Sequence, residues 1–210
     1  LSAAIIEYYA KNAEAFLVPV QLTPKSGEAD VESTPIGVLF GVQPWNFPYY
    51  QLARFAAPNL MAGNVVMVKH AASVPQCAVA FEQLWLDAGA PEGAYTNLRI
   101  SHDQVNRVID DRRIKGIALT GSVEAGRSVA ARAGQNLKKA TMELGGSDAF
   151  IVLEDADLDK TVRWAVQARM ANTGQSCVAA KRFIIVESVA DAFTAKFKAA
   201  LEALAPGDPM

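Results

Sequence analysis

The chain has 210 residues, of which 51% are hydrophobic and 20% are charged, and its formal net charge is -2. This composition suits a globular protein with a substantial core, and it excludes a disordered or fibrous chain. The charge leaves no basic excess to neutralise phosphates, so it disfavours a nucleic-acid binder and favours small-molecule ligands.

Short apolar runs rich in β-branched residues alternate along the chain with segments of helical spacing. In chain order we predict a helix over 1–16, then strands at 38–42, 65–69, 94–100, 116–121 and 140–144, with helices over 50–60, 76–88, 103–110 and 124–135 between them. Parallel strands need such crossover connections, so the alternation predicts an α/β fold with a Rossmann-like open parallel sheet. Ligands of such sheets bind beyond the carboxyl ends of the strands.

A second pattern begins after Gly145 and Gly146, with predicted strands at 149–153 and 183–186 and helices over 158–170 and 189–204. Because adjacent glycines permit backbone conformations closed to other residues, we place a domain boundary there. The expected domains are a cofactor-binding domain over 1–144 and the start of a second α/β domain over 145–210. Both ends break off abruptly, so we expect a middle fragment of a longer protein.

The cysteines, acids and apolar runs exclude several classes of site. Cys77 and Cys177 form neither a disulfide framework nor a zinc pattern, and we interpret both as reduced thiols. Asp157, in the acidic run 154–157, precedes a predicted helix and is interpreted as its N-cap, so no metal site is predicted. No apolar run approaches the roughly 20 residues of a membrane helix and no secretory leader is visible, so we expect a cytoplasmic protein.

Two residues are candidates for the catalytic steps of a reaction, one as a nucleophile and one as a general base. Cys177 follows the polar turn 172–176, and a thiol at the start of a helix gains thiolate character; the alternative is a buried structural cysteine. Glu143 ends an apolar strand just before Gly145, where a partly dry carboxylate should have a raised pKa and can act as a general base. The alternative for Glu143 is a solvated charge at a strand end.

Other strand ends offer groups that suit a nucleotide or an oxyanion. The Asn46 amide, between Pro44 and Pro48, can donate to a developing oxyanion, although the segment also suits a loop with a packed Trp45. Further groups, which offer a cation, a hydroxyl and close backbone approach to a ribose or phosphate, are Lys69, Thr120, Gly121, Ser122 and Gly126. The usual dinucleotide glycine fingerprint is absent.

Five motifs together resemble the aldehyde dehydrogenase superfamily over essentially all 210 residues: PWNFP at 44–48, VK at 68–69, TGS at 120–122, MELGG at 142–146 and NTGQSC at 172–177. The resemblance implies that Cys177 is the nucleophile, that Glu143 is the general base, and that Asn46 and the Cys177 backbone amide form the oxyanion hole. The cofactor contacts that it implies are Trp45, Asn46, Lys69, Ala72, Gly121, Ser122, Gly126 and Leu144.

The activity implied by the resemblance is oxidation of a small aldehyde to its acid with NAD or NADP, through a thiohemiacetal and a thioester on Cys177. Retention of Glu143 argues against the branch of the family that transfers its acyl group to coenzyme A. Members of the family are expected to assemble as homodimers or homotetramers. The alternatives left open are a general aliphatic aldehyde dehydrogenase and a catalytically silent nucleotide-binding protein on this fold.

Cofactor and substrate preference depend on departures from the family pattern. Ala72 stands where NAD-specific members commonly have a ribose-binding Glu, which permits NADP near Lys69 and His70, or simply leaves room for NAD. We interpret His70 as a strand-end spacer.

Arg54 stands eight residues after Asn46 on a predicted apolar helix, and at this position the sequence resembles members that act on succinate semialdehyde. A guanidinium suits the carboxylate of such a substrate because it can bind both carboxylate oxygens. The alternative is an Arg paired with a nearby acid. A second Arg that such members often place six residues before the nucleophile is absent; Ala171 holds that position and Arg169 lies two residues earlier.

Overall fold

The computed structural model describes residues 1–208. Its contacts divide the chain into two compact units, Leu1–Leu144 (unit 1) and Gly145–Met210 (unit 2). Gly145 and Gly146 stand at the start of unit 2, but neither has a positive φ. The backbone at this point therefore does not use the left-handed conformation that glycine permits.

Unit 1 contains an open parallel sheet with the strand order β5-β4-β3-β6-β7. Its elements are α1 (Ser2–Leu17), β1 (Val20–Leu22), β2 (Ala29–Val31), β3 (Val38–Gln43), α2 (Pro48–Met61), β4 (Val65–His70), α3 (Pro75–Asp87), β5 (Tyr95–Asn97), α4 (His102–Asp110), β6 (Ile114–Thr120), α5 (Val123–Gln135) and β7 (Lys139–Glu143). The predicted α/β class and parallel sheet are confirmed.

Two details of unit 1 differ from the predictions. The antiparallel hairpin of β1 and β2 was not predicted, because its strands are short and their apolar residues are mostly exposed. β5 is shorter than the predicted 94–100, since its pairing with β4 covers Tyr95 to Asn97 alone.

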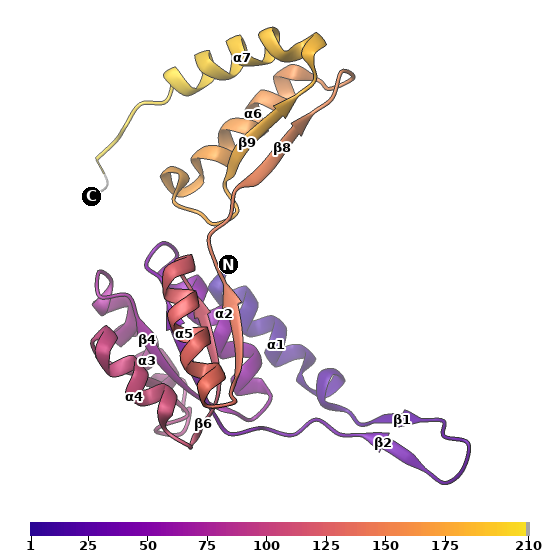
Figure 1. Ribbon diagram of the computed structural model, residues 1–210, viewed down its shortest axis with the longest axis vertical. Helices are drawn as coiled ribbons and strands as arrows, with labels where there is room; N and C mark the ends of the chain where they lie inside the picture. The colour runs from indigo at the N-terminus through magenta and orange to yellow at the C-terminus, as the bar shows by residue number, and fades with distance from the viewer. Residues whose placement is uncertain (209–210) are drawn as a thin grey trace. The chain divides into compact units, whose positions relative to one another are not determined.

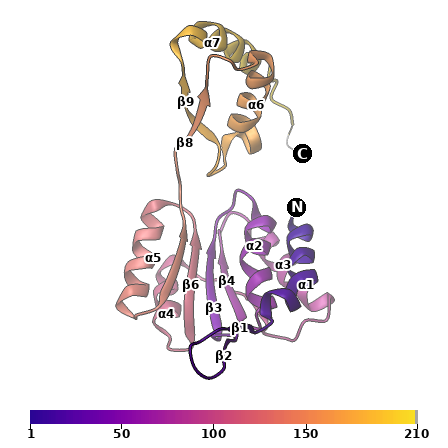
Figure 2. The same ribbon diagram turned by 90° about the vertical axis from the view of Figure 1, so that its right-hand side faces the viewer.

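Helices cover both faces of the sheet, α4 and α5 on one side and α1, α2 and α3 on the other (Figure 2). Phe40 and Ile117 pack against α4 and α5, whereas Val66 and Val68 pack against α2 and α3. Strands buried on both faces explain the continuous apolar runs in the sequence.

Helix α2 lies close against β3 because position 41 is glycine. A Cβ at Gly41 would lie 2.5 Å from the Phe55 ring. A side chain there would push α2 away from the sheet, so Gly41 fixes the helix that carries Arg54.

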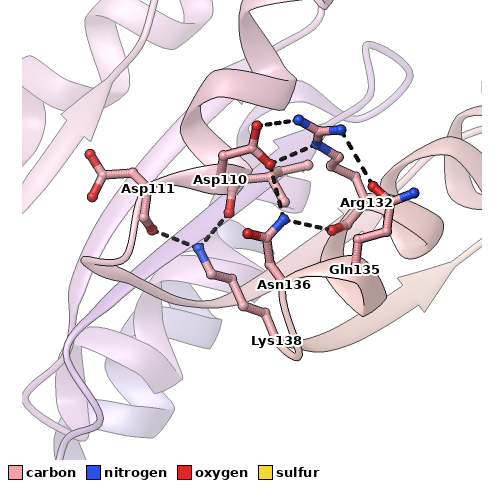
Figure 3. Close-up of polar contacts among 7 residues, drawn as sticks. Asp110, Asp111, Arg132, Gln135, Asn136 and Lys138 are labelled. Carbon is pink, nitrogen blue, oxygen red and sulfur yellow. Dashed lines mark hydrogen bonds and ion pairs between the residues drawn. The ribbon is translucent and has the colours of Figure 1, made fainter.

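A polar network joins the ends of α4 and α5 to the start of β7 (Figure 3). Asp110 accepts hydrogen bonds from Arg132 Nε (2.6 Å) and Asn136 Nδ2 (2.9 Å), and Lys138 Nζ donates to the carbonyl oxygens of Ile109 and Asp111. The Arg132 guanidinium holds the pKa of Asp110 below its usual range. The network anchors the strand that ends at Glu143.

Unit 2 pairs two parallel strands with two helices (Figure 1). Its elements are β8 (Asp148–Val152), α6 (Leu158–Met170), the 3-10 turn η1 (Ala171–Gly174), β9 (Ala180–Ile185) and α7 (Glu187–Glu202). Val152, Val162 and Phe193 form the centre of its core. The Asp157 carboxylate accepts from Lys160 N at 3.1 Å, which confirms the predicted N-cap of α6.

Residues 1–208 lack two kinds of feature. None of the helices in this range combines the length and the apolar composition of a membrane-spanning segment. The same range holds no group of three or more His, Cys, Asp or Glu side chains placed to bind a metal ion.

Candidate active site

The predicted site residues of unit 1 follow the carboxyl ends of its parallel strands. Asn46 lies between β3 and α2, Lys69 is next to last in β4, Ser122 lies between β6 and α5, and Glu143 ends β7. The strand register pairs Val42 with Lys69 and, on β6 and β7, Thr120 with Glu143. These residues therefore share the edge of the sheet at which α/β proteins bind ligands.

Glu143 is paired with Arg54. Glu143 Oε2 lies 3.4 Å from Arg54 Nη2, with the side chains 55% and 37% exposed, respectively. The partly dry surroundings predicted for Glu143 are therefore wrong. The Arg54 guanidinium also lies 5.9 Å from the centre of the Tyr50 ring. The alternative in which Arg54 pairs with a nearby acid is what the structure shows, and that acid is the candidate base.

A cavity of about 320 Å³ is lined by Arg54 and Glu143 together with Gln43 and Gln51. Both glutamines are buried, at 4% and 2% exposed, and within residues 1–208 each has an amide oxygen without a hydrogen-bond partner. Buried polar atoms are normally satisfied by protein, water or ligand. Sequence reasoning missed this polar wall; the available signal was a glutamine in an apolar strand and another in an apolar helix.

A second cavity, of about 230 Å³, lies beside β4 and β5 and is lined by Lys69, Ala72 and Arg99 among others. Lys69 is buried, and this burial lowers its pKa. No acidic residue lines this cavity among the described residues. Arg99 was not predicted, because it falls within the strand predicted over 94–100, whereas in the structure it lies just beyond the end of β5.

His70 also lines the second cavity, and its Nδ1 has local backbone contacts. The Ala71 amide nitrogen lies 2.9 Å from Nδ1 and the Gln43 carbonyl oxygen lies 3.3 Å from it, whereas the buried Nε2 has no hydrogen-bond partner within residues 1–208. Burial lowers the pKa of His70, which favours the neutral ring. This environment fits the interpretation of His70 as a spacer.

The turn from β6 into α5 has structural roles in addition to its predicted cofactor contacts. Ser122 Oγ caps α5 by accepting from Ala125 N at 3.1 Å, and Gly121 N donates to Glu143 O at 2.9 Å. A Cβ at Gly126 would lie 2.5 Å from Leu144 Cδ2, so the helix approaches this leucine closely only because residue 126 is glycine. The amides at the start of α5 suit a phosphate.

Cys177 belongs to unit 2, where it lies half-buried in the turn between η1 and β9. No helix begins at Cys177, so the predicted thiolate stabilisation by a helix dipole is wrong. The turn is instead held by a lysine side chain and by a backbone hydrogen bond. Lys181 Nζ donates to the carbonyl oxygens of Gly146 (2.7 Å) and Cys177 (3.4 Å), and Ala179 N donates to Ser176 O at 3.2 Å.

Comparison with known proteins gives a family match over the whole sequence, because the Aldehyde dehydrogenase family model matches residues 1–210. The chain belongs to the aldehyde dehydrogenase family. The resemblance based on five short motifs is confirmed at the level of the family. The roles of individual residues in this aldehyde dehydrogenase chain stay predictions.

The relatives of this aldehyde dehydrogenase chain include named succinate-semialdehyde dehydrogenases. It is 49% identical over 209 residues to the NADP(+) enzyme of Deinococcus radiodurans, covering 100% of this chain and 44% of that one. It is 47% identical over 208 residues to the NAD(P)+ enzyme Sad of Escherichia coli, covering 99% and 45%.

A solved structure is also similar to the chain. The crystal structure of succinic semialdehyde dehydrogenase from Streptococcus pyogenes in complex with NADP+ has a TM-score of 0.98 at 47% identity, over 100% of this chain and 46% of that one. The chain thus spans less than half the length of the relatives it matches.

The residues of this aldehyde dehydrogenase chain fit a nicotinamide dinucleotide. The second cavity offers Lys69 and Arg99 without an opposing carboxylate, which suits the negative charge of phosphates. The capped start of α5 adds backbone amides that can donate to a diphosphate.

Proposed function

We propose that the protein containing this chain oxidises succinate semialdehyde to succinate with NADP+ or NAD+. The observation that carries the proposal is the position of Arg54, which lines the cavity of about 320 Å³ with its guanidinium 3.4 Å from a carboxylate oxygen. A guanidinium that already accommodates the Glu143 carboxylate can bind the carboxylate of a short semialdehyde. The names of relatives at 47% and 49% identity support this substrate.

The proposed chemistry divides among three residues. The Cys177 thiolate adds to the aldehyde carbon, and the Asn46 side chain and the Cys177 amide donate hydrogen bonds to the resulting oxyanion. NADP+ or NAD+, when bound, supplies the acceptor for hydride. Glu143 then removes a proton from the water that cleaves the Cys177 thioester, which releases the acid and regenerates the thiol.

Arg54 serves two carboxylates in this scheme. Exposed ion pairs contribute about 0–1 kcal/mol, so exchange of the Glu143 carboxylate for that of the substrate costs little. Binding of the substrate carboxylate would then release Glu143 to accept a proton from water. A carboxylated aldehyde thereby favours the active state of the base, whereas an uncharged aldehyde leaves the pair intact.

Arg54→Gln in the complete protein containing this chain tests the substrate. We expect the KM for succinate semialdehyde to rise roughly tenfold or more, because a charge-assisted hydrogen bond of about 1.5–3 kcal/mol is lost. The KM for butanal should stay unchanged, as should both values in the control Arg112→Gln, which alters an exposed arginine of the same unit. Equal changes for both aldehydes would instead favour a general aliphatic aldehyde dehydrogenase.

The second cavity supports a preference for NADP+ over NAD+. Lys69 and Arg99 offer two cations, and Ala72 provides no carboxylate to repel a 2′-phosphate. Ala72→Glu should raise the KM for NADP+ roughly tenfold and leave that for NAD+ within about twofold, because the new charge repels only the phosphorylated ribose. Parallel changes for both cofactors would contradict this assignment.

Assembly and location are further parts of the proposal. A homodimer or homotetramer and a cytoplasmic location stay predictions for the complete protein. Sedimentation equilibrium of that protein measures the first, and fractionation of cells that express it measures the second.

A further inference from the structure

Arg169, in the last turn of α6, bridges the backbone on the two sides of Cys177. Its Nη1 donates to Ala180 O at 2.9 Å and its Nη2 donates to Gly174 O at 3.2 Å. These acceptors stand three residues after and three residues before Cys177. One guanidinium therefore spans the segment 174–180, which we name the Cys177 loop.

The backbone that leads into the Cys177 loop is strained. Asn172, Thr173 and Gly174 have φ values of 52°, 55° and 78°. A β-branched residue such as Thr rarely adopts this left-handed conformation, and it persists only where surrounding contacts enforce it. The two bonds from Arg169 are contacts of this kind, because one of them holds the residue that follows Thr173.

Gly174 leaves room for the guanidinium. A Cβ at this position would lie 2.4 Å from Arg169 Nη2, so a side chain would displace the arginine. Both the positive φ and this close approach require glycine. The position of the Arg169 guanidinium thus depends on a glycine at residue 174.

Arg169 donates both of these hydrogen bonds to backbone carbonyl oxygens. Its planar fork suits this use, since two N–H groups can reach two oxygens at fixed separation. A lysine could donate to the same carbonyls only from a single, flexible nitrogen.

We propose that Arg169 is a positioning residue that holds the Cys177 amide and thiol in their reactive geometry, and that it does not bind the carboxylate of the substrate. The inference rests on the proposed nucleophilic role of Cys177. It assigns a function to the arginine that lies two residues before the place where related enzymes often have a substrate-binding one.

The test compares Arg169→Gln and Arg169→Lys with Arg163→Gln in the complete protein containing this chain. Arg163 is an exposed arginine on the same helix and provides the matched control. The measurements are kcat and KM for succinate semialdehyde and butanal, the rate of Cys177 alkylation by iodoacetamide mapped by mass spectrometry, and circular dichroism to establish folding.

We expect Arg169→Gln to lower kcat by roughly tenfold to a hundredfold for both aldehydes, because a misplaced reacting group slows the chemical step. Cys177 alkylation should slow in parallel, Arg169→Lys should recover part of both losses, and the ratio of kcat/KM between the aldehydes should stay within about twofold. Arg163→Gln should match the wild type. If Arg169→Gln does not fold, the same comparison is made with Arg169→Lys.

Two results would overturn the inference. A rise in KM confined to the carboxylated aldehyde would make Arg169 a substrate ligand. If kcat, expressed per Cys177 thiol that can be titrated, and the rate of Cys177 alkylation both stay unchanged, Arg169 would be a purely structural residue. If the wild type oxidises neither aldehyde, the proposed function fails, whereas slowed Cys177 alkylation in Arg169→Gln still supports the positioning role.

Discussion

The two units hold their candidate reactive residues by different physical means. In unit 1, Asn46, Lys69 and Glu143 occupy or follow the ends of parallel strands, so the register of the sheet and its two buried faces place them. In unit 2, Cys177 lies in a turn held by side-chain bonds from Arg169 and Lys181 to backbone carbonyls.

This difference predicts how each site responds to change. A strand end is supported by many backbone bonds and by burial, so single surface changes should move it little. A turn held by a few charge-assisted bonds depends on each donor, so a single substitution should misplace the thiol. The predictions below follow from this contrast, beginning with the largest effect.

Glu143→Gln should reduce steady-state turnover by roughly 10²–10⁴-fold, because general-base catalysis contributes about this much. The protein should stay folded, because folding of β7 does not require a charge at its end. Stopped-flow absorbance should still show a burst of NAD(P)H, since acylation precedes the step that needs the base. The control Glu92→Gln, an exposed residue of a turn, should behave as the wild type. Loss of the burst together with turnover would place Glu143 in an earlier step.

Gly126→Ala should destabilise unit 1 by about 1–3 kcal/mol, because its Cβ would overlap Leu144. Gly134→Ala provides the control on the same helix; nothing lies within 4 Å of its Cβ, and we expect a gain of about 0.4–1 kcal/mol. Urea denaturation measures both. Equal effects would show that α5 adjusts freely against Leu144.

Thr173→Asn should stabilise unit 2 by up to about 1 kcal/mol, because Asn tolerates the left-handed conformation better than a β-branched residue. Thr194→Asn, within α7, should instead destabilise slightly, since Asn is a weak helix former. Thermal denaturation separates the two. A loss of stability in Thr173→Asn would mean that the Thr173 hydroxyl bond to Asn172 O outweighs the strain.

Acidification should weaken unit 1 through Asp110. Because Arg132 lowers the pKa of Asp110 in the folded chain, the associated stability is present above its usual value of 3.8 and is lost as the pH falls further. Asp110→Asn should flatten the fall in urea midpoint below about pH 4, while Asp30→Asn, in the exposed hairpin, should not. Identical pH profiles for both variants would contradict the role of the network in Figure 3.

Sequence patterns predicted unit 1 well for a physical reason. Strands buried on both faces appear as apolar runs, and the helices between them have their own period, so the sheet and its carboxyl edge follow from the sequence. The hairpin of β1 and β2 was not predicted, because exposed strands of three residues leave no such pattern in the sequence.

The local chemistry of the site was less predictable. The contact between Arg54 and Glu143 joins residues far apart in the chain and depends on rotamers, so neither its existence nor the exposure of Glu143 follows from local spacing. The motif around Cys177 suggested a helix start, whereas the structure has a turn held by Arg169. Bonds from long side chains to carbonyls leave no periodic signal in a sequence.

The most direct test of the account is acid-quench mass spectrometry of the Glu143→Gln protein after mixing with succinate semialdehyde and NADP+. The account predicts a succinyl group on the peptide that contains Cys177 and none on the peptide that contains Cys77. An adduct on Cys77, or turnover without any adduct on Cys177, would contradict the assignment of Cys177 as the nucleophile.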